Sequence, residues 1–193
     1  MPQRPAVEED ESRRQAMQYF IRAKVFESEG NYLGAIVALR NAADLDDKSP
    51  TIYAQLAYDY RRIDDLQMAV HFAQKGLELA PDDTRLRRFL IELSERRGER
   101  RFAIEQIEEL LEYERTNWSL YRHLAYLYLE TGQAERITPL FEKIIDKEEV
   151  SAEVKVDIAS IFNSIGKREH AEEIYRKILA KDPQVEDAWL GLA

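Results

Sequence analysis

Cysteine is absent from the 193 residues, which excludes a disulfide framework and thiolate chemistry. Glycine and proline, both of which interrupt helices, occur only 7 and 6 times. No apolar run approaches the length of a membrane span. The formal net charge of -9 opposes general binding to nucleic acids or anionic membranes, while it allows a local basic patch. These shortages favour an almost wholly helical protein without a membrane span.

Residues 50–83 have the pattern of two helices joined by a short turn. Tyr53, Ala57 and Tyr60 share one face of the first helix because they recur at helical spacing. Asp64 and Asp65 interrupt this pattern, and either can cap a second helix. Two helices joined by so short a turn must lie antiparallel.

This unit recurs every thirty-four residues without insertion or deletion. The copies begin at Ala16, Pro50, Thr84, Trp118 and Ala152. At the turn where the second copy has Asp64, the other copies have a glycine, at Gly30, Gly98, Gly132 and Gly166. Small residues recur at the expected close contacts, namely Ala23, Ala57, Ala125, Ala159 and Ala193 on the first helix and Ala35, Ala69, Ala103 and Ala171 on the second. Because one hairpin cannot bury its own apolar face, neighbouring copies must cover each other.

The period and its order of aromatic, small and turn residues resemble the tetratricopeptide repeat family. The resemblance implies an all-α, right-handed superhelical solenoid of antiparallel helix-turn-helix repeats, with five repeats and one extra helix. Some positions depart from the family pattern, namely Arg22, Arg87, Ile91, Ser94 and Ile137. Pro139 lies well inside the fourth copy's second helix, so either that helix kinks or it starts late with Thr138 as its cap.

The chain divides into an acidic N-terminal segment and an array of repeats. We expect residues 1–12 to be disordered and residues 13–193 to form the solenoid. The repeats are predicted at about 16–49, 50–83, 84–117, 118–151 and 152–185, followed by a partial sixth at 186–193. This last segment lacks the polar face of a terminal cap. We therefore expect a longer repeat protein, or self-association through an uncapped C-terminal end.

Catalytic patterns are absent from the sequence. The three histidines, His71, His123 and His170, lie in different copies, and no metal motif, phosphate loop or nucleophile elbow occurs. We therefore predict a protein that is not an enzyme and that needs neither a cofactor nor a metal.

The family resemblance implies that the first helices line a concave, peptide-binding groove. The residues that it places there, and that we predict to bind, are Tyr58, Arg61, Arg62, Arg85, Arg88, Arg122 and Tyr126. Arginine forks match carboxylates, so the predicted partner is an acidic or carboxylate-bearing peptide. The alternative is that Arg61, Arg62 and Arg88 pair with neighbouring glutamates along the array. A chaperone-tail receptor is disfavoured because Phe20, Lys24, Ala54 and Tyr58 do not match the family's carboxylate clamp.

The leading prediction is a non-catalytic protein-protein interaction scaffold that holds a partner segment in this groove. The alternatives are a recruitment region of a larger multidomain enzyme that continues beyond Ala193, and an RNA-binding module of a related half-repeat type, which the net charge opposes. The N-terminus has no apolar stretch typical of a signal peptide. We expect a soluble protein, cytoplasmic by default and periplasmic if a leader has been removed.

Overall fold

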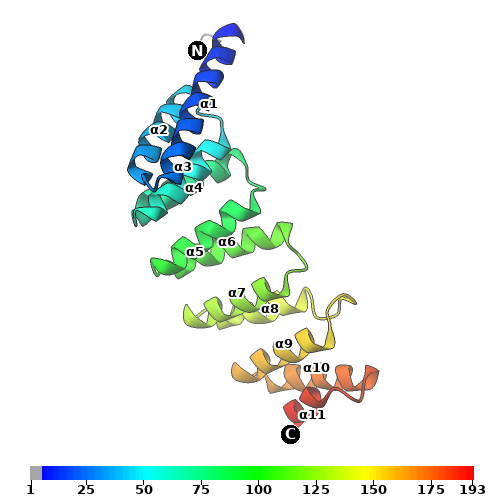
Figure 1. Cartoon of the computed structure of the whole chain (residues 1–193). Coiled ribbons are helices and arrows are strands. Elements are labelled where there is room, and N and C mark those ends of the chain that lie inside the picture. Colours follow the sequence, from blue (N-terminus) through cyan, green and yellow to red (C-terminus); the bar gives the residue numbers. More distant parts are fainter. Residues whose placement is uncertain (1–5) are drawn as a thin grey trace. The chain divides into compact units, whose positions relative to one another are not determined.

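The structure is a computed structural model that describes residues 6–193. Within that range the chain forms eleven α-helices and one short 3-10 helix, and no strand. The chain separates into two compact units, one ending at Gln106 and the other beginning at Ile107. The division falls within helix α6, and each unit is described by itself. The expected all-α architecture of helix-turn-helix repeats is confirmed (Figure 1).

The first unit is built from successive helical pairs. Helices α1 (Ala6–Ser28) and α2 (Tyr32–Leu45) pack together, as do α3 (Pro50–Arg62) and α4 (Leu66–Leu79). Each pair also contacts the next, through α2 with α3 and α4 with α5 (Thr84–Arg96). Helix α6 (Arg100–Tyr113) follows α5. The apolar face of each hairpin is therefore covered by its neighbour, as the repeat pattern predicts.

The second unit contains shorter and less regular pieces. Helix α7 (Trp118–Glu130) packs with the 3-10 helix η1 (Ala134–Arg136) and with α8 (Ile137–Glu142). Helices α9 (Ala152–Ser164) and α10 (Arg168–Lys181) form a pair, and α11 (Glu186–Leu192) packs against both.

The turns follow from local chemistry. The five turn residues at the thirty-four-residue period, including Asp64, all have positive φ, between 61° and 78°. Four of them are glycine, which adopts this conformation without a steric penalty. Of the two candidate caps for α4, the structure selects Asp65, whose carboxylate accepts from the Met68 N–H at 3.1 Å. Asn31 and Asp83 cap α2 and α5 in the same way.

Alanines and aromatic rings that recur every thirty-four residues form much of the core. Of the nine alanines predicted at close helix contacts, eight have no exposed surface, whereas Ala193 is exposed. The rings that recur in the second and fourth copies, Tyr53, Tyr60, Tyr121 and Tyr128, are all buried. The third copy replaces these rings with Arg87 and Ser94. Both are buried, and Arg87 donates to the Gln106 amide oxygen at 3.1 Å and the Pro81 carbonyl at 2.9 Å. Hydrogen bonds thus substitute there for ring packing.

Two expectations about helix starts need correction. Helix α1 begins at Ala6, so residues 6–12 are helical although we expected disorder throughout residues 1–12; residues 1–5 lie outside the described residues. The acidic run at residues 8–11 thus belongs to the first two turns of this helix rather than to a disordered segment. In the fourth copy the late start is correct, because α8 begins at Ile137 with Pro139 in its first turn. Thr138 is not its cap, since it lies inside the helix with a buried hydroxyl that has no hydrogen-bond partner among the described residues.

Candidate functional site

An aromatic contact joins the first helices of the second and third repeats. The rings of Tyr58 on α3 and Phe89 on α5 meet edge to face, with centroids 4.7 Å apart. The Arg61 guanidinium carbon lies 4.9 Å from the Phe89 centroid. Arg61 also donates to both carboxylate oxygens of Glu92, at 2.8 and 3.1 Å. Arg61 is therefore held in place and already ion-paired, as the alternative interpretation of these arginines predicts.

Arg62, the next residue, has a different environment. Its guanidinium donates to the neutral hydroxyl of Tyr32 on α2 at 2.7 Å, and its side chain is exposed. Arg62, Arg61 and Tyr58 line one cavity of about 490 Å³ in the first unit. Lys24 contributes a further cation to the same wall. The structure thus brings three of the predicted residues to one concavity.

Arg85 and Arg88 extend the basic surface onto α5. Both side chains are exposed, and Arg88 takes part in interactions within the protein. Arg85 and Arg61 act on Tyr58 electrostatically: burial and the charge of Asp83 raise the pKa of the Tyr58 hydroxyl, and the two arginines oppose that rise. We refer to Arg61, Arg62, Arg85 and Arg88 as the arginine face.

Two acidic residues line the same cavity, and the sequence interpretation missed them. Asp59 is only 2% exposed, and its Oδ2 atom is buried without a hydrogen-bond partner among the described residues. Burial raises the pKa of the Asp59 carboxyl to about 6, and the charge of Glu27 adds to the rise. Glu27 forms an ion pair with Lys24. A signal for Asp59 exists in the sequence, because the same repeat position holds Leu93, Leu127 and Ile161 elsewhere.

In the second unit the predicted residues are Arg122 and Tyr126 on α7. Arg122 forms an ion pair with Asp157 of α9 at 3.1 Å, and both side chains are about half exposed. Arg122 and Asp157 border a separate cavity of about 210 Å³, lined mainly by apolar side chains such as Trp118, Phe141 and Ile158. Tyr126 is exposed and does not line that cavity. The seven predicted residues therefore fall into two sets, five in the first unit and two in the second.

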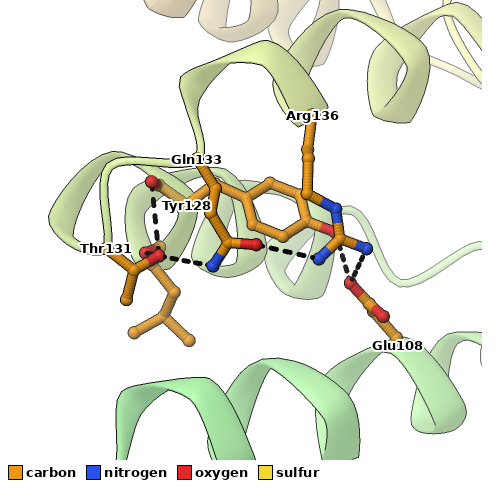
Figure 2. A network of polar contacts seen from close by, with 6 residues as sticks. Glu108, Tyr128, Thr131, Gln133 and Arg136 are labelled. Carbon is orange, nitrogen blue, oxygen red and sulfur yellow. Dashed lines mark hydrogen bonds and ion pairs between the residues drawn. The ribbon is translucent and has the colours of Figure 1, made fainter.

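A polar network within the second unit connects α6, α7 and the start of the fourth copy's second helix (Figure 2). Glu108 Oε1 accepts from Arg136 at 2.6 Å and from the Tyr128 hydroxyl. Arg136 also donates to Gln133, whose amide donates to Thr131. Burial, together with the Glu108 hydrogen bond, raises the pKa of Tyr128 well above its ordinary value. The network has a structural role, because it ties the irregular η1 segment to the helices beside it.

Residues 6–193 contain neither a candidate metal site nor a candidate membrane-spanning helix. That part of the chain contains no group of three or more histidine, aspartate or glutamate side chains arranged to hold a metal ion. No helix there is both long and apolar enough to cross a membrane.

Known proteins that resemble this chain identify its repeat and its fold. Residues 50–83 match the tetratricopeptide repeat family. The chain carries a tetratricopeptide repeat. The match covers the copy that the sequence pattern marks most clearly, and the predicted resemblance is confirmed. No curated protein matches the sequence significantly.

Several solved structures share the tetratricopeptide repeat fold. MamA from Desulfovibrio magneticus RS-1 is 17% identical over 89% of this chain and 97% of its own, with a TM-score of 0.55. YrrB, described as a tetratricopeptide repeat protein with an unusual peptide-binding site, is 17% identical over 95% and 94%, with a TM-score of 0.58. The first such domain of Spaghetti (RPAP3), bound to the HSP90 peptide SRMEEVD, is 18% identical over 62% and 98%, with a TM-score of 0.51. At these identities the likeness shows the fold alone.

Proposed function

We propose that the protein is an interaction scaffold and that its arginine face, with Tyr58, binds an acidic segment of a partner protein. The observation that carries the proposal is the environment of Arg62. This side chain lines the cavity beside Tyr58 and, among residues 6–193, donates to the Tyr32 hydroxyl rather than to a carboxylate. A partner carboxylate can therefore be bound there without separating an ion pair between Arg62 and those residues. Arginine and tyrosine are the residue types that most often dominate binding energy at protein interfaces.

The other arginines contribute less each. Arg61 must exchange its bond to Glu92 for one to the ligand, which offsets most of the gain. Arg85 and Arg88 add long-range attraction from α5. In the second unit, Arg122 and Tyr126 form a proposed weaker contact, because Asp157 already compensates the charge of Arg122.

Two of the similar structures support a peptide as the ligand. YrrB has a peptide-binding site, and the Spaghetti domain holds the peptide SRMEEVD, whose last four residues include three acidic ones. A rigid array of packed helices is suited to this role, since it loses little conformational entropy on binding.

The experiment is a binding titration with a fluorescein-labelled octaglutamate peptide, followed by fluorescence anisotropy. We expect Arg62→Glu to raise the dissociation constant at least about tenfold, corresponding to about 1.4 kcal/mol. The matched control is Arg101→Glu, which reverses an exposed arginine on α6 of the same unit. Octalysine of equal length is the control ligand. Equal weakening by both variants, or no binding of octaglutamate at low salt, would overturn the proposal.

We also propose self-association through the C-terminal end, as the sequence predicts. Trp189 and Leu190 on α11 are 57% and 73% exposed, whereas the ring equivalent to Trp189 is buried at Tyr53 and Tyr121. Large exposed apolar groups of this kind mark contact surfaces. Leu190→Glu should reduce any concentration-dependent association that depends on this end, as measured by sedimentation velocity, and unchanged sedimentation would argue against it.

A further inference from the structure

An exposed apolar stripe runs along helix α1. Met17, Ile21 and Val25 are 58%, 57% and 50% exposed, and they follow each other at intervals of four residues. Residues spaced by four form a ridge on a helix surface, and packing of two such ridges is the commonest class of helix contact. The stripe is therefore shaped like one half of a helix-helix interface.

The later repeats indicate how this face is used. The position of Ile21 is occupied in the third repeat by Phe89, which is buried and contacts Tyr58 of the preceding repeat. The position of Val25 is occupied by Leu93, Leu127 and Ile161, all of them buried. In the third repeat the positions of Ile21 and Val25 are thus buried, and the ring at the first of them packs against the preceding repeat. On α1 the same two positions are exposed.

Charges at the two ends of the stripe identify the occupant. At the same spacing the ridge ends in Arg13 on one side and Glu29 on the other, each eight positions from Ile21. Both side chains are exposed, and Arg13 also takes part in an interaction within the protein. Glu29 continues the helical turn, since its N–H donates to the Val25 carbonyl at 3.2 Å. A ridge that is basic at one end, apolar in the middle and acidic at the other is complementary to itself when reversed.

We infer that α1 pairs antiparallel with α1 of a second copy of this chain, around a twofold axis at Ile21. Residues equally distant from Ile21 then face each other. Met17 lies opposite Val25 of the second copy, and Arg13 lies opposite its Glu29. Such an isologous contact closes at two subunits. It buries the stripe and places opposite charges together at both ends, whereas a parallel pairing would place like charges together. This dimer is independent of the arginine face and of the C-terminal end.

The test is the oligomeric state of the full chain, measured by sedimentation equilibrium up to several hundred micromolar. All variants carry Leu190→Glu, so that any association through the C-terminal end is suppressed. We expect a dimer in this background. Ile21→Glu should raise the dimer dissociation constant at least about tenfold, because two carboxylates then meet at the axis. Val37→Glu, which removes a similarly exposed apolar side chain from α2, is the matched control and should leave a dimer.

A charge exchange tests the antiparallel orientation. Arg13→Glu alone and Glu29→Arg alone should each weaken the dimer, since each puts like charges opposite one another. The double variant should recover most of the lost affinity. Circular dichroism and thermal melting verify that every variant is folded. A monomer at all concentrations, a dimer unaffected by Ile21→Glu, or a double variant no better than the single ones would overturn the inference.

Discussion

The first helices of the repeats carry different charges in the two units, although one repeat pattern describes both units. In the first unit α3 and α5 present the four residues of the arginine face. In the second unit α7 has Arg122 as its one arginine and α9 has none, and Asp157 pairs with Arg122. Packing positions thus recur from repeat to repeat, while exposed positions vary freely. A chain with a net charge of -9 can in this way hold a local basic surface.

The second helices differ as well. Helices α2 and α4 each run for 14 residues, whereas α8 has 6 residues and follows a separate 3-10 turn. Proline in the first turn of a helix costs little, but further inside it would remove a backbone hydrogen bond and clash with the preceding turn. Pro139 therefore delays the start of α8, and the Glu108–Arg136 pair holds the segment that precedes it. The following predictions probe these differences, from the largest expected effect to the smallest.

The largest effect concerns Asp59, which occupies a repeat position that is apolar in both repeats of the second unit. Because its pKa is about 6 in the folded protein and 3.8 ordinarily, the folded state holds the proton more tightly than the unfolded chain. Stability is therefore lost as pH rises from about 4 to about 6, by up to about 3 kcal/mol. Asp59→Asn should remove this loss, so its advantage over the wild type appears at pH 8 and vanishes at pH 4. Urea denaturation at both values measures it.

The control for that experiment is Asp82→Asn, which changes an exposed carboxyl in the same unit. It should leave the difference between the two pH values unchanged. If Asp59→Asn behaves like Asp82→Asn, the buried carboxyl does not govern the pH dependence of the first unit.

The positions of close helix contact should tolerate larger side chains equally poorly in both units. Ala69 and Ala171 have no exposed surface, so added methylenes must displace neighbouring side chains. Ala69→Leu and Ala171→Leu should each lower the free energy of unfolding by about 1–3 kcal/mol. Chemical denaturation followed by circular dichroism measures both. Unchanged stability in both variants would contradict the thirty-four-residue register.

The polar network of the second unit should contribute less to the free energy of unfolding. Tyr128 is buried and donates to a charged acceptor, so Tyr128→Phe leaves Glu108 with Arg136 as its remaining partner in the network. We expect a loss of about 1–2 kcal/mol. Tyr60→Phe, at the same position of the second repeat, is the comparison and should change stability less. Because both substitutions keep the ring, an equal or larger loss at Tyr60 would show that the hydrogen bond to Glu108 does not explain the effect.

The smallest expected effect is a gain in stability, at Thr138. The Thr138 hydroxyl is buried without a hydrogen-bond partner among the described residues, and valine has nearly the same shape. Thr138→Val should therefore raise the free energy of unfolding by about 0.5–1.5 kcal/mol. Thr131→Val should lower it, because that hydroxyl donates to the Leu127 carbonyl at 2.7 Å. Thermal melts of the two variants should move in opposite directions.

The sequence predicted the packing much better than the surface. The period, the turn glycines and the buried alanines follow from spacing, because each repeat must satisfy the same neighbour contacts. The cap of α4 and the start of α8 depend on three-dimensional fit and were left as alternatives. The structure places the arginines on α3, α5 and α7, and their role in binding stays a prediction. Their partners were not predicted, since Glu92 and Asp157 lie 31 and 35 residues away. Only the folded chain shows that Arg61 and Arg122 are ion-paired while Arg62 faces a hydroxyl.

The most direct test of the central claim compares one arginine from each unit. Arg62→Glu and Arg122→Glu are each titrated with labelled octaglutamate at low and at high salt. We predict that Arg62→Glu abolishes most of the salt-dependent binding and that Arg122→Glu costs no more than about threefold, since its charge is already compensated. An equal loss in both variants, or a greater loss with Arg122→Glu, would contradict a binding surface centred on the first unit.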